Sequence, residues 1–491
     1  MSPAHHTRER RWLALLLVVL VIGLVAGVAG NRGKPVPVGA LALPSAQVAS
    51  VDAESSAWYC TGQSTGSAGS GVDPGQLVLA NTTTRPVAAS IDTVTDTGAT
   101  EQTAVSVPAR QTVVPSLTAP SSGSWEAQTV TLAGGGVSVS QTVDGTSGWS
   151  VAPCQSTTSA TWYFAGGSTE GTDGLSLALL NPTSIPVVVD LSFVTPSGTV
   201  HPINYQGIVL SPGELQVEDI ASEVQNMSSV STVVATRTGR VVASELQAFS
   251  APATGLSLLP GAIAPQAHWV IPQSQEPAGG VGELDVFNPG TQSESVTVHL
   301  QLPSGPLHPL TDRIAPGSTW ILRTSSQTRI PDNTTYTTSI DANGGPGVVV
   351  ARLVSIPSVA QTPQAGLANA VDGLTASAAS GEWVVPAPGT SGSPASSGAA
   401  PDYLALANQS GTREQFAAFA LTPSGTKLLA TGVLGAGTTG IVDGSALSTA
   451  GFDPIVVRAS GPMGVSEDMG PTAGIGVVTM PGIPLAQQNG L

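Results

Sequence analysis

Four segments of the chain are copies of one pattern, and this repetition limits the possible folds more than any other feature of the sequence. Each copy opens with a tryptophan in a short strand-like run, at Trp58, Trp162, Trp269 and Trp383. Successive tryptophans are 104, 107 and 114 residues apart. A propeller blade needs only about 45 residues, whereas a small domain of its own needs about 100. The chain is therefore expected to contain four units of the same kind.

Within each copy, short segments end at a recurring asparagine or glycine. Apolar and polar residues alternate before the asparagine, which indicates a half-buried strand, and asparagine favours a turn at the end of that strand. A second strand ends at a Pro-Ser-Gly turn in three copies, where glycine supplies the positive φ that other residues resist. The tryptophans are expected to fill the core of each unit. The recurring turn positions are Asn81, Asn181, Asn288, Asn408, Gly198, Gly305 and Gly425.

Composition favours strands over helices. The 491 residues include 57 Gly and 39 Pro, and only 10% are charged, whereas helix surfaces usually need Glu, Lys and Arg. Turn signals about every 8 to 12 residues are typical of sandwiches. We therefore predict an all-β protein of tandem immunoglobulin-like β-sandwich units. The predicted units are residues 56–155, 156–253, 264–355 and 379–485, with linkers at 250–266 and 356–381 and a loop insertion at 386–402.

The N-terminal region predicts a membrane anchor. The run from Trp12 to Gly30 carries no charge and would span about 28 Å as a helix, close to the thickness of a bilayer core. Three arginines within residues 8–11 precede it, so the tail of residues 1–11 is expected in the cytoplasm and the bulk of the chain outside the cell. Residues 31–55, rich in Pro, Ala and Gly, suit a linker. A signal peptide cleaved near residues 27–29, giving a secreted protein, is the alternative.

Charge and cysteine content both fit an exported chain. Beyond residue 34 there are 11 Lys and Arg against 31 Asp and Glu, a formal charge of −20. Nucleic acids and anionic membrane surfaces bind proteins that carry dense positive charge, so no nucleic-acid partner is expected for this acidic chain. The two cysteines, Cys60 and Cys154, both lie in the exported part. In an oxidising compartment such a pair predicts one disulfide.

The second copy resembles a repeat family of uncharacterised function found in exported bacterial proteins, typically from actinobacteria. That family has a Trp-Tyr-Phe-Ala-Glu-Gly-like opening, a strand ended by Asn-Pro, a glycine turn and a closing segment near Glu-Arg. The matching residues here are Trp162 to Thr169, Asn181-Pro182, Gly198 and Ala243-Ser244-Glu245, with departures at Gly166 and Leu246. The resemblance is good for this copy, fair for residues 264–352 and faint for the others. It implies an exported array of β-sandwiches and carries no catalytic residues.

The sequence contains no constellation that indicates catalysis or metal binding. Ser64 sits in a G-x-S-x-G pattern, but a nucleophile elbow needs a helix after the serine, and this one lies in a Gly-rich loop. The six histidines are scattered and have no metal-ligand spacing. Acidic pairs occur at Glu218-Asp219, with Glu223 nearby, and at Glu467-Asp468, and counting alone does not exclude a glycosidase. We predict no catalytic residue, no metal and no cofactor.

These observations lead to a ranked set of functions. The first is a single-pass, membrane-anchored structural or interaction protein of the bacterial cell envelope without catalytic activity, whose partner is an envelope protein or a wall polymer. The second is a carbohydrate- or wall-polymer-binding module, which the low aromatic content of 4% makes less favourable. The third is an accessory enzyme acting on envelope glycans.

Overall fold

The computed structural model describes one compact unit within residues 43–491. The described residues are 44–65, 72–118, 122–145, 147–250, 253–276, 279–332, 334–356, 367–375, 381–385, 403–469 and 478–486. Among them, no helix is both long and apolar enough to cross a membrane. The predicted anchor at residues 12–30 and the predicted insertion at 386–402 lie outside the described residues.

Strands make up most of the described chain, with one α-helix among the described residues. The first repeat contributes β1 (Ser56–Ser64), β2 (Val72–Asn81), β3 (Val87–Thr95), β4 (Thr100–Val107), β5 (Thr112–Val113), β6 (Trp125–Leu132), β7 (Val137–Gly145) and β8 (Gly148–Pro153). The second contributes β9 (Thr161–Phe164), β10 (Gly174–Leu180), β11 (Val187–Thr195), β12 (Gly198–Val200), η1 (Ile203–Tyr205), β13 (Gln206–Leu210), β14 (Leu215–Asp219), η2 (Ile220–Ser222), β15 (Ser231–Thr238), β16 (Val242–Phe249) and β17 (Gly255–Leu259).

The third repeat contributes β18 (His268–Gln275), β19 (Val281–Asn288), β20 (Glu294–Leu302), β21 (Gly305–Pro306), β22 (Leu310–Ile314), β23 (Ser318–Arg323), η3 (Thr324–Ser326), β24 (Thr335–Asn343), β25 (Val349–Ile356), β26 (Leu367–Asp372) and β27 (Leu374–Thr375). The fourth contributes β28 (Glu382–Val385), β29 (Tyr403–Asn408), β30 (Glu414–Thr422), β31 (Gly425–Leu434), β32 (Thr439–Val442), α2 (Gly444–Leu447), η5 (Ser448–Ala450), β33 (Ile455–Ala459), β34 (Met463–Met469), β35 (Val478–Pro481) and β36 (Ile483–Pro484). The all-β prediction is confirmed.

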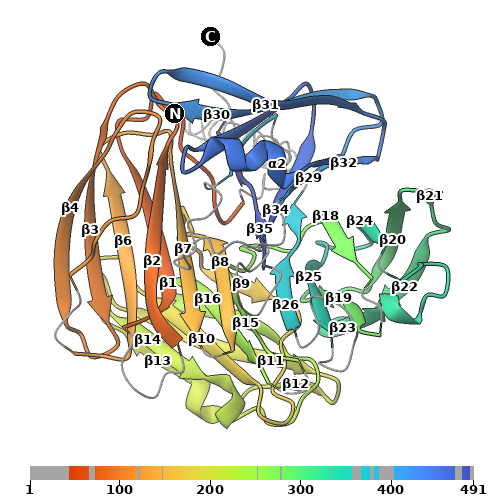
Figure 1. Cartoon of the computed structure of the whole chain (residues 1–491). Helices are drawn as coiled ribbons and strands as arrows, with labels where there is room; N and C mark the ends of the chain where they lie inside the picture. The colour runs from red at the N-terminus through yellow and green to blue at the C-terminus, as the bar shows by residue number, and fades with distance from the viewer. Residues whose placement is uncertain are drawn as a thin grey trace, which may run out of the picture. The chain divides into compact units, whose positions relative to one another are not determined.

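Each repeat places its strands in the same two orders. In the second repeat these are β14-β10-β16-β17 and β12-β11-β15-β9, and in the fourth they are β32-β29-β34-β35 and β31-β30-β33-β28-β36. The first repeat has both orders joined into one sheet, because the end of β1 pairs in parallel with β2 at Ser64 and Pro74. Figure 1 shows β4, β3, β6 and β1 side by side in this sheet. The repetition seen in the sequence is thus a repetition of sheet topology.

The four recurring tryptophans are buried. Trp58, Trp162, Trp269 and Trp383 are at most 2% exposed, and each belongs to a different apolar cluster. The indole Nε1 of Trp162 donates to the carbonyl of Val241 at 3.0 Å, so its one polar atom is satisfied. Burying an indole contributes about 4 to 6 kcal/mol as an upper estimate. The tryptophans therefore form part of the apolar core of each repeat.

The recurring asparagines clamp the ends of their strands. β2, β19 and β29 end at Asn81, Asn288 and Asn408, and β10 ends one residue before Asn181. In every repeat the amide Nδ2 donates to the carbonyl four residues later, at 2.7 to 2.8 Å, and to a carbonyl 26 to 29 residues later, at 3.0 to 3.2 Å. Oδ1 accepts from the backbone N–H two residues later, which is an Asx turn. One buried side chain thus fixes both a turn and the neighbouring strand.

The glycine turns follow the expected backbone chemistry. Gly198, Gly305 and Gly425 have φ values of 118°, 126° and 151°, which side-chain-bearing residues rarely adopt. Each of these glycines is the first residue after the turn, at the start of the next strand.

The described parts of the segments predicted as linkers contain strands, so the linker interpretation was wrong for these residues. β17 lies within residues 250–266 and pairs with β16, and β26 lies within 356–381 and pairs with β25. The last strands of the sheets, β8, β17, β26 and β35, contact one another in that order, and β35 also contacts β8. The four repeats therefore meet through a closed cycle of strands.

Part of the predicted N-terminal linker, residues 31–55, also belongs to this packing. Val48 is fully buried and forms a parallel bridge with Leu485. Its N–H donates to the carbonyl of Pro484, and its carbonyl accepts from the N–H of Ala486, both at 2.9 Å. On the other side, the carbonyl of Ala49 accepts from the N–H of Gly136, in the first repeat, at 2.9 Å. The segment that precedes the first repeat thus joins the first repeat to the end of the fourth.

Candidate binding pocket

A pocket lies where the ends of the four repeats converge, and we call it the hub pocket. Each repeat supplies a short Pro- or Gly-containing segment, which lies at or just after the end of β8, β17, β26 or β35. These segments include Pro153 from the first repeat, Pro260 and Gly261 from the second, Asp372 and Gly373 from the third, and Pro481 and Gly482 from the fourth, and Pro44, Gln266, Trp269 and Leu374 complete much of the wall. The open space measures about 640 Å³, including its mouth.

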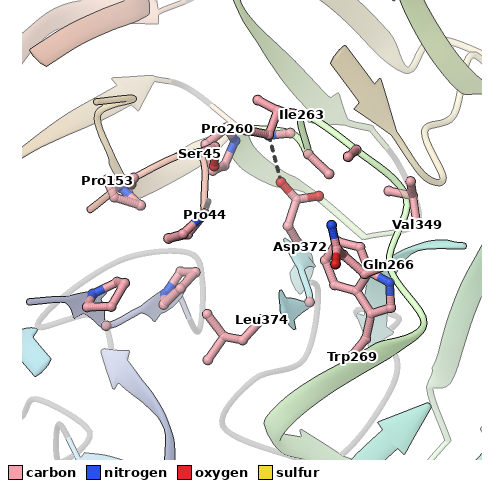
Figure 2. A pocket seen from close by; sticks show the side chains of 18 residues that line it. Pro44, Ser45, Pro153, Pro260, Ile263, Gln266, Trp269, Val349, Asp372 and Leu374 are labelled. Atoms are coloured by element: carbon pink, nitrogen blue, oxygen red, sulfur yellow. Dashed lines mark hydrogen bonds between the residues drawn. The ribbon is translucent and has the colours of Figure 1, made fainter. Parts of the chain in front are cut away.

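Asp372 is the one carboxylate among the hub-pocket residues (Figure 2). Its Oδ2 accepts a hydrogen bond from the backbone N–H of Gly261 at 2.9 Å, which ties the end of β26 to the segment after β17. Its Oδ1 is buried and has no hydrogen-bond partner. Burial raises the pKa of Asp372 to about 7, although the bond from Gly261 opposes this. The residue therefore gains or loses its proton close to neutral pH.

Glu245 on β16 is a second buried acid near Asp372. It is fully buried, and its Oε2 accepts from the hydroxyl of Thr232 at 2.9 Å. Burial is the main cause that raises its pKa to about 8; the hydrogen bond from Thr232 opposes the rise and the negative charge of Asp372 contributes to it. Two acids that repel each other in an apolar surrounding favour the protonated forms. The junction between the second and third repeats is thus sensitive to proton concentration.

Glu245 occupies a position that is polar in all four repeats. It pairs across its sheet with the leucine four residues before the recurring asparagine. The corresponding residues are Gln141 opposite Leu77, Glu245 opposite Leu177, Arg352 opposite Leu284, and Glu467 opposite Leu404. All four are at most 7% exposed. The sheets therefore share a buried polar position whose charge differs from repeat to repeat.

Arg352 uses this position to connect the third and fourth repeats. Its Nη1 donates to the carbonyl of Gln273 at 2.9 Å, and its Nη2 donates to Oγ1 of Thr479 on β35 at 3.1 Å. The hydroxyl of Thr479 in turn donates to Asp468. Burial raises the pKa of Asp468 to about 6, and the charge of Arg352 limits the rise. A buried cation and a buried acid thus meet where these two repeats contact.

The structure places the other residues considered from sequence as follows. Cys60 and Cys154 form a disulfide, as predicted. Ser64 lies buried at the end of β1, where its hydroxyl donates to the carbonyl of Ser124 at 3.3 Å. Glu467 and Asp468 are buried on β34, whereas Glu218 and Asp219 lie on β14.

Two of the histidines that are scattered in sequence come together. His268 Nδ1 and His299 Nε2 lie 2.7 and 3.2 Å from the two carboxylate oxygens of Asp341. All three side chains are partly exposed. Within the described part of the chain, no group of three or more His, Cys, Asp or Glu has an arrangement that could hold a metal ion.

Sequence reasoning missed Asp372, because it lies in a stretch assigned to a linker. A signal for it does exist. Pro260-Gly261, Asp372-Gly373 and Pro481-Gly482 are dipeptides at matching places in three repeats, and they all line the hub pocket. The recurrence of these dipeptides at the ends of three copies is the sequence signal for the hub-pocket residues.

Residues 133–322 match a family model described as "Family of unknown function (DUF5719)". This part of the chain is therefore similar to a family whose function is not established. The match is consistent with the resemblance to an uncharacterised family, and the DUF5719 region runs from the turn before β7 to β23, so it does not coincide with whole repeats. No curated protein matches the chain.

Two solved structures align with the chain at low similarity. A protein described as Thermotoga maritima 1070 is 18% identical over 23% of this chain and 95% of its own, with a TM-score of 0.20. A tetra-tandem repeat from the extending region of a large adhesion protein is 10% identical over 83% of this chain and 93% of its own, with a TM-score of 0.12.

Proposed function

We propose that the protein is a structural or interaction protein of the bacterial cell envelope, anchored through residues 12–30, with its bulk outside the cytoplasm. In this proposal the paired sheets of each repeat are immunoglobulin-like β-sandwich units. Their support is the buried tryptophan cluster of each repeat and the shared strand order. The support for export is the Cys60–Cys154 disulfide, since such bonds persist in oxidising compartments.

The observation that carries the proposal is which repeats bear the large exposed apolar side chains. Most of the large exposed apolar residues belong to the second and fourth repeats. They are Ile185, Val200, Ile203 and Val209 in the second repeat, and Leu428, Val433, Ile441 and Phe452 in the fourth, with exposures from 39% to 82%. We infer that exposed apolar side chains on these two repeats contribute to contacts with partners. The recurring residues stabilise the repeats. The surfaces that differ between repeats are therefore available to bind a partner.

In-cell photocrosslinking tests this proposal. A photoreactive residue at Ile203 or at Val433 is expected to capture an envelope protein or a wall polymer, because these side chains are 82% and 58% exposed. The matched control is the same residue at Gln102, which is exposed on β4 in the first repeat. If neither apolar site gives more product than Gln102, the interaction role is wrong. Release of soluble sugars from purified envelopes by the full chain would instead support the enzyme alternative.

A further inference from the structure

We propose that the groove between the third and fourth repeats binds neutral sugar residues of an envelope polysaccharide. The groove is lined by Gln301, Thr335, Thr438 and Thr439, with Pro303 and Ile441 among its apolar walls. It holds about 560 Å³ of open space, including the solvent at its mouth. The proposal rests on the wall-polymer form of the proposed function and gives it a site, and it uses one of the exposed apolar residues, Ile441.

The groups that a ligand can reach are all uncharged. Gln301, Thr335, Thr438 and Thr439 are partly exposed, and none of the groove's lining residues is acidic or basic. Amide and hydroxyl groups both donate and accept hydrogen bonds, as sugar hydroxyls do. A charged ligand would find no opposite charge to offset its desolvation. The chemistry of the groove therefore selects a neutral, hydroxyl-rich ligand.

Apolar surfaces stand beside these polar groups. Ile441 is 51% exposed on β32, and Pro303 is exposed at the end of β20. Sugar rings present C–H faces as well as hydroxyl edges, so they need both kinds of contact. Beneath them, Gln273 is only 3% exposed, and its Oε1 has no hydrogen-bond partner.

A peptide strand fits this groove less well. The edge strand on its fourth-repeat side, β32, has only four residues, from Thr439 to Val442. Short edge strands are poor templates for strand addition. The exported part also carries 31 acidic against 11 basic residues, which repels anionic polymers. These two features favour a neutral sugar over a peptide or an acidic glycan.

Calorimetry with the full chain in a detergent that has no sugar headgroup tests the proposal. The probes are maltose, cellobiose and N,N′-diacetylchitobiose, with digalacturonate as the acidic counterpart and tetra-alanine as the peptide. At least one neutral disaccharide should bind saturably. Gln301→Ala and Thr335→Val should each weaken that binding about tenfold, because each removes a hydrogen-bonding group. The matched controls Gln102→Ala and Thr100→Val, on the first repeat, should leave it unchanged.

Several outcomes would overturn the assignment. They are no saturable binding of any neutral disaccharide, equal binding of digalacturonate or tetra-alanine, or unchanged affinity in both groove variants. Since Thr335 is only partly buried, Thr335→Val should fold, and circular dichroism checks this for each variant. Photocrosslinking at Ile203 should be unaffected by the groove variants, so failure of the groove and failure of the proposed partner contact give different results.

Discussion

Replacing Asn181 with alanine tests the role of the recurring asparagine most sharply. Its Nδ2 donates to the carbonyls of Ile185, Leu210 and Ser211 at 2.8, 3.1 and 3.0 Å. Its Oδ1 accepts from both the N–H and the hydroxyl of Thr183, at 3.0 and 2.7 Å. Asn181→Ala removes all five hydrogen bonds while leaving the tryptophan cluster of the repeat untouched.

The expected loss follows from how many of these partners water can reach. The bond to Leu210 is buried, so its carbonyl is left unsatisfied at a cost of about 1 to 3 kcal/mol. The other hydrogen-bonding partners are partly buried, so water can replace the lost bonds. Each of these losses costs about 0.5 kcal/mol or more. The free energy of unfolding should therefore fall by about 2 to 5 kcal/mol. Asn181→Asp should destabilise at least as much, because it places a carboxylate oxygen against three carbonyl oxygens.

Guanidinium unfolding of the full chain, followed by tryptophan fluorescence, measures this loss. A chain of four repeats can unfold in more than one step, so the midpoint of each phase is compared. The matched control is Asn204→Ala, since Asn204 is exposed and its Nδ2 donates only to Glu223. The control should change stability by no more than about 0.5 kcal/mol. If Asn181→Ala lowers the free energy of unfolding as little as Asn204→Ala does, Asn181 does not hold the end of its strand.

Two further perturbations test the buried acids and the disulfide. Because burial raises the pKa of Glu245 to about 8, the folded chain keeps a proton that the unfolded chain releases above its ordinary pKa, so stability should fall as pH rises from about 5 to 8. Glu245→Gln should make this fall shallower in melting temperatures measured at pH 5.5 and 8.5, and an unchanged slope would contradict the assignment. The Cys60–Cys154 bond spans 94 residues, so replacing both cysteines with serine should cost up to about 4.7 kcal/mol in denaturant unfolding. A wild-type chain whose midpoint does not change on reduction would argue against that stabilisation.

The parts of the fold that sequence predicts are those set by local chemistry. Asn181 and Gly198 mark turns because their side chains, or lack of one, act within a few residues, and Trp162 marks a core because a large apolar ring gains most from burial. Each such residue signals its role wherever it occurs. This is why strand ends, turns and repeat starts could be read directly.

The missed parts depend on contacts between repeats. The strand Gly255–Leu259 has no long alternating pattern, and it is a strand because β16 pairs with it and β8 and β26 pack beside it. Asp372 is a lone acid among small residues, and only the convergence of four repeat ends gives it a pocket. Arg352 and Glu245 share a register position that no single copy reveals. Long-range packing is invisible when each copy is read by itself.

The bridge between Val48 and Leu485 holds the two ends of the described chain together, so that the four repeats close around the hub pocket. A cysteine pair at Val48 and Leu485 tests this directly, since these bridge partners lie within disulfide reach. Mild oxidation of Val48→Cys/Leu485→Cys, followed by non-reducing mass spectrometry of the digested full chain, should show near-complete crosslinking. The control pair Val48→Cys/Phe452→Cys should show little. Equal and low crosslinking in both pairs would contradict the closure of the four repeats.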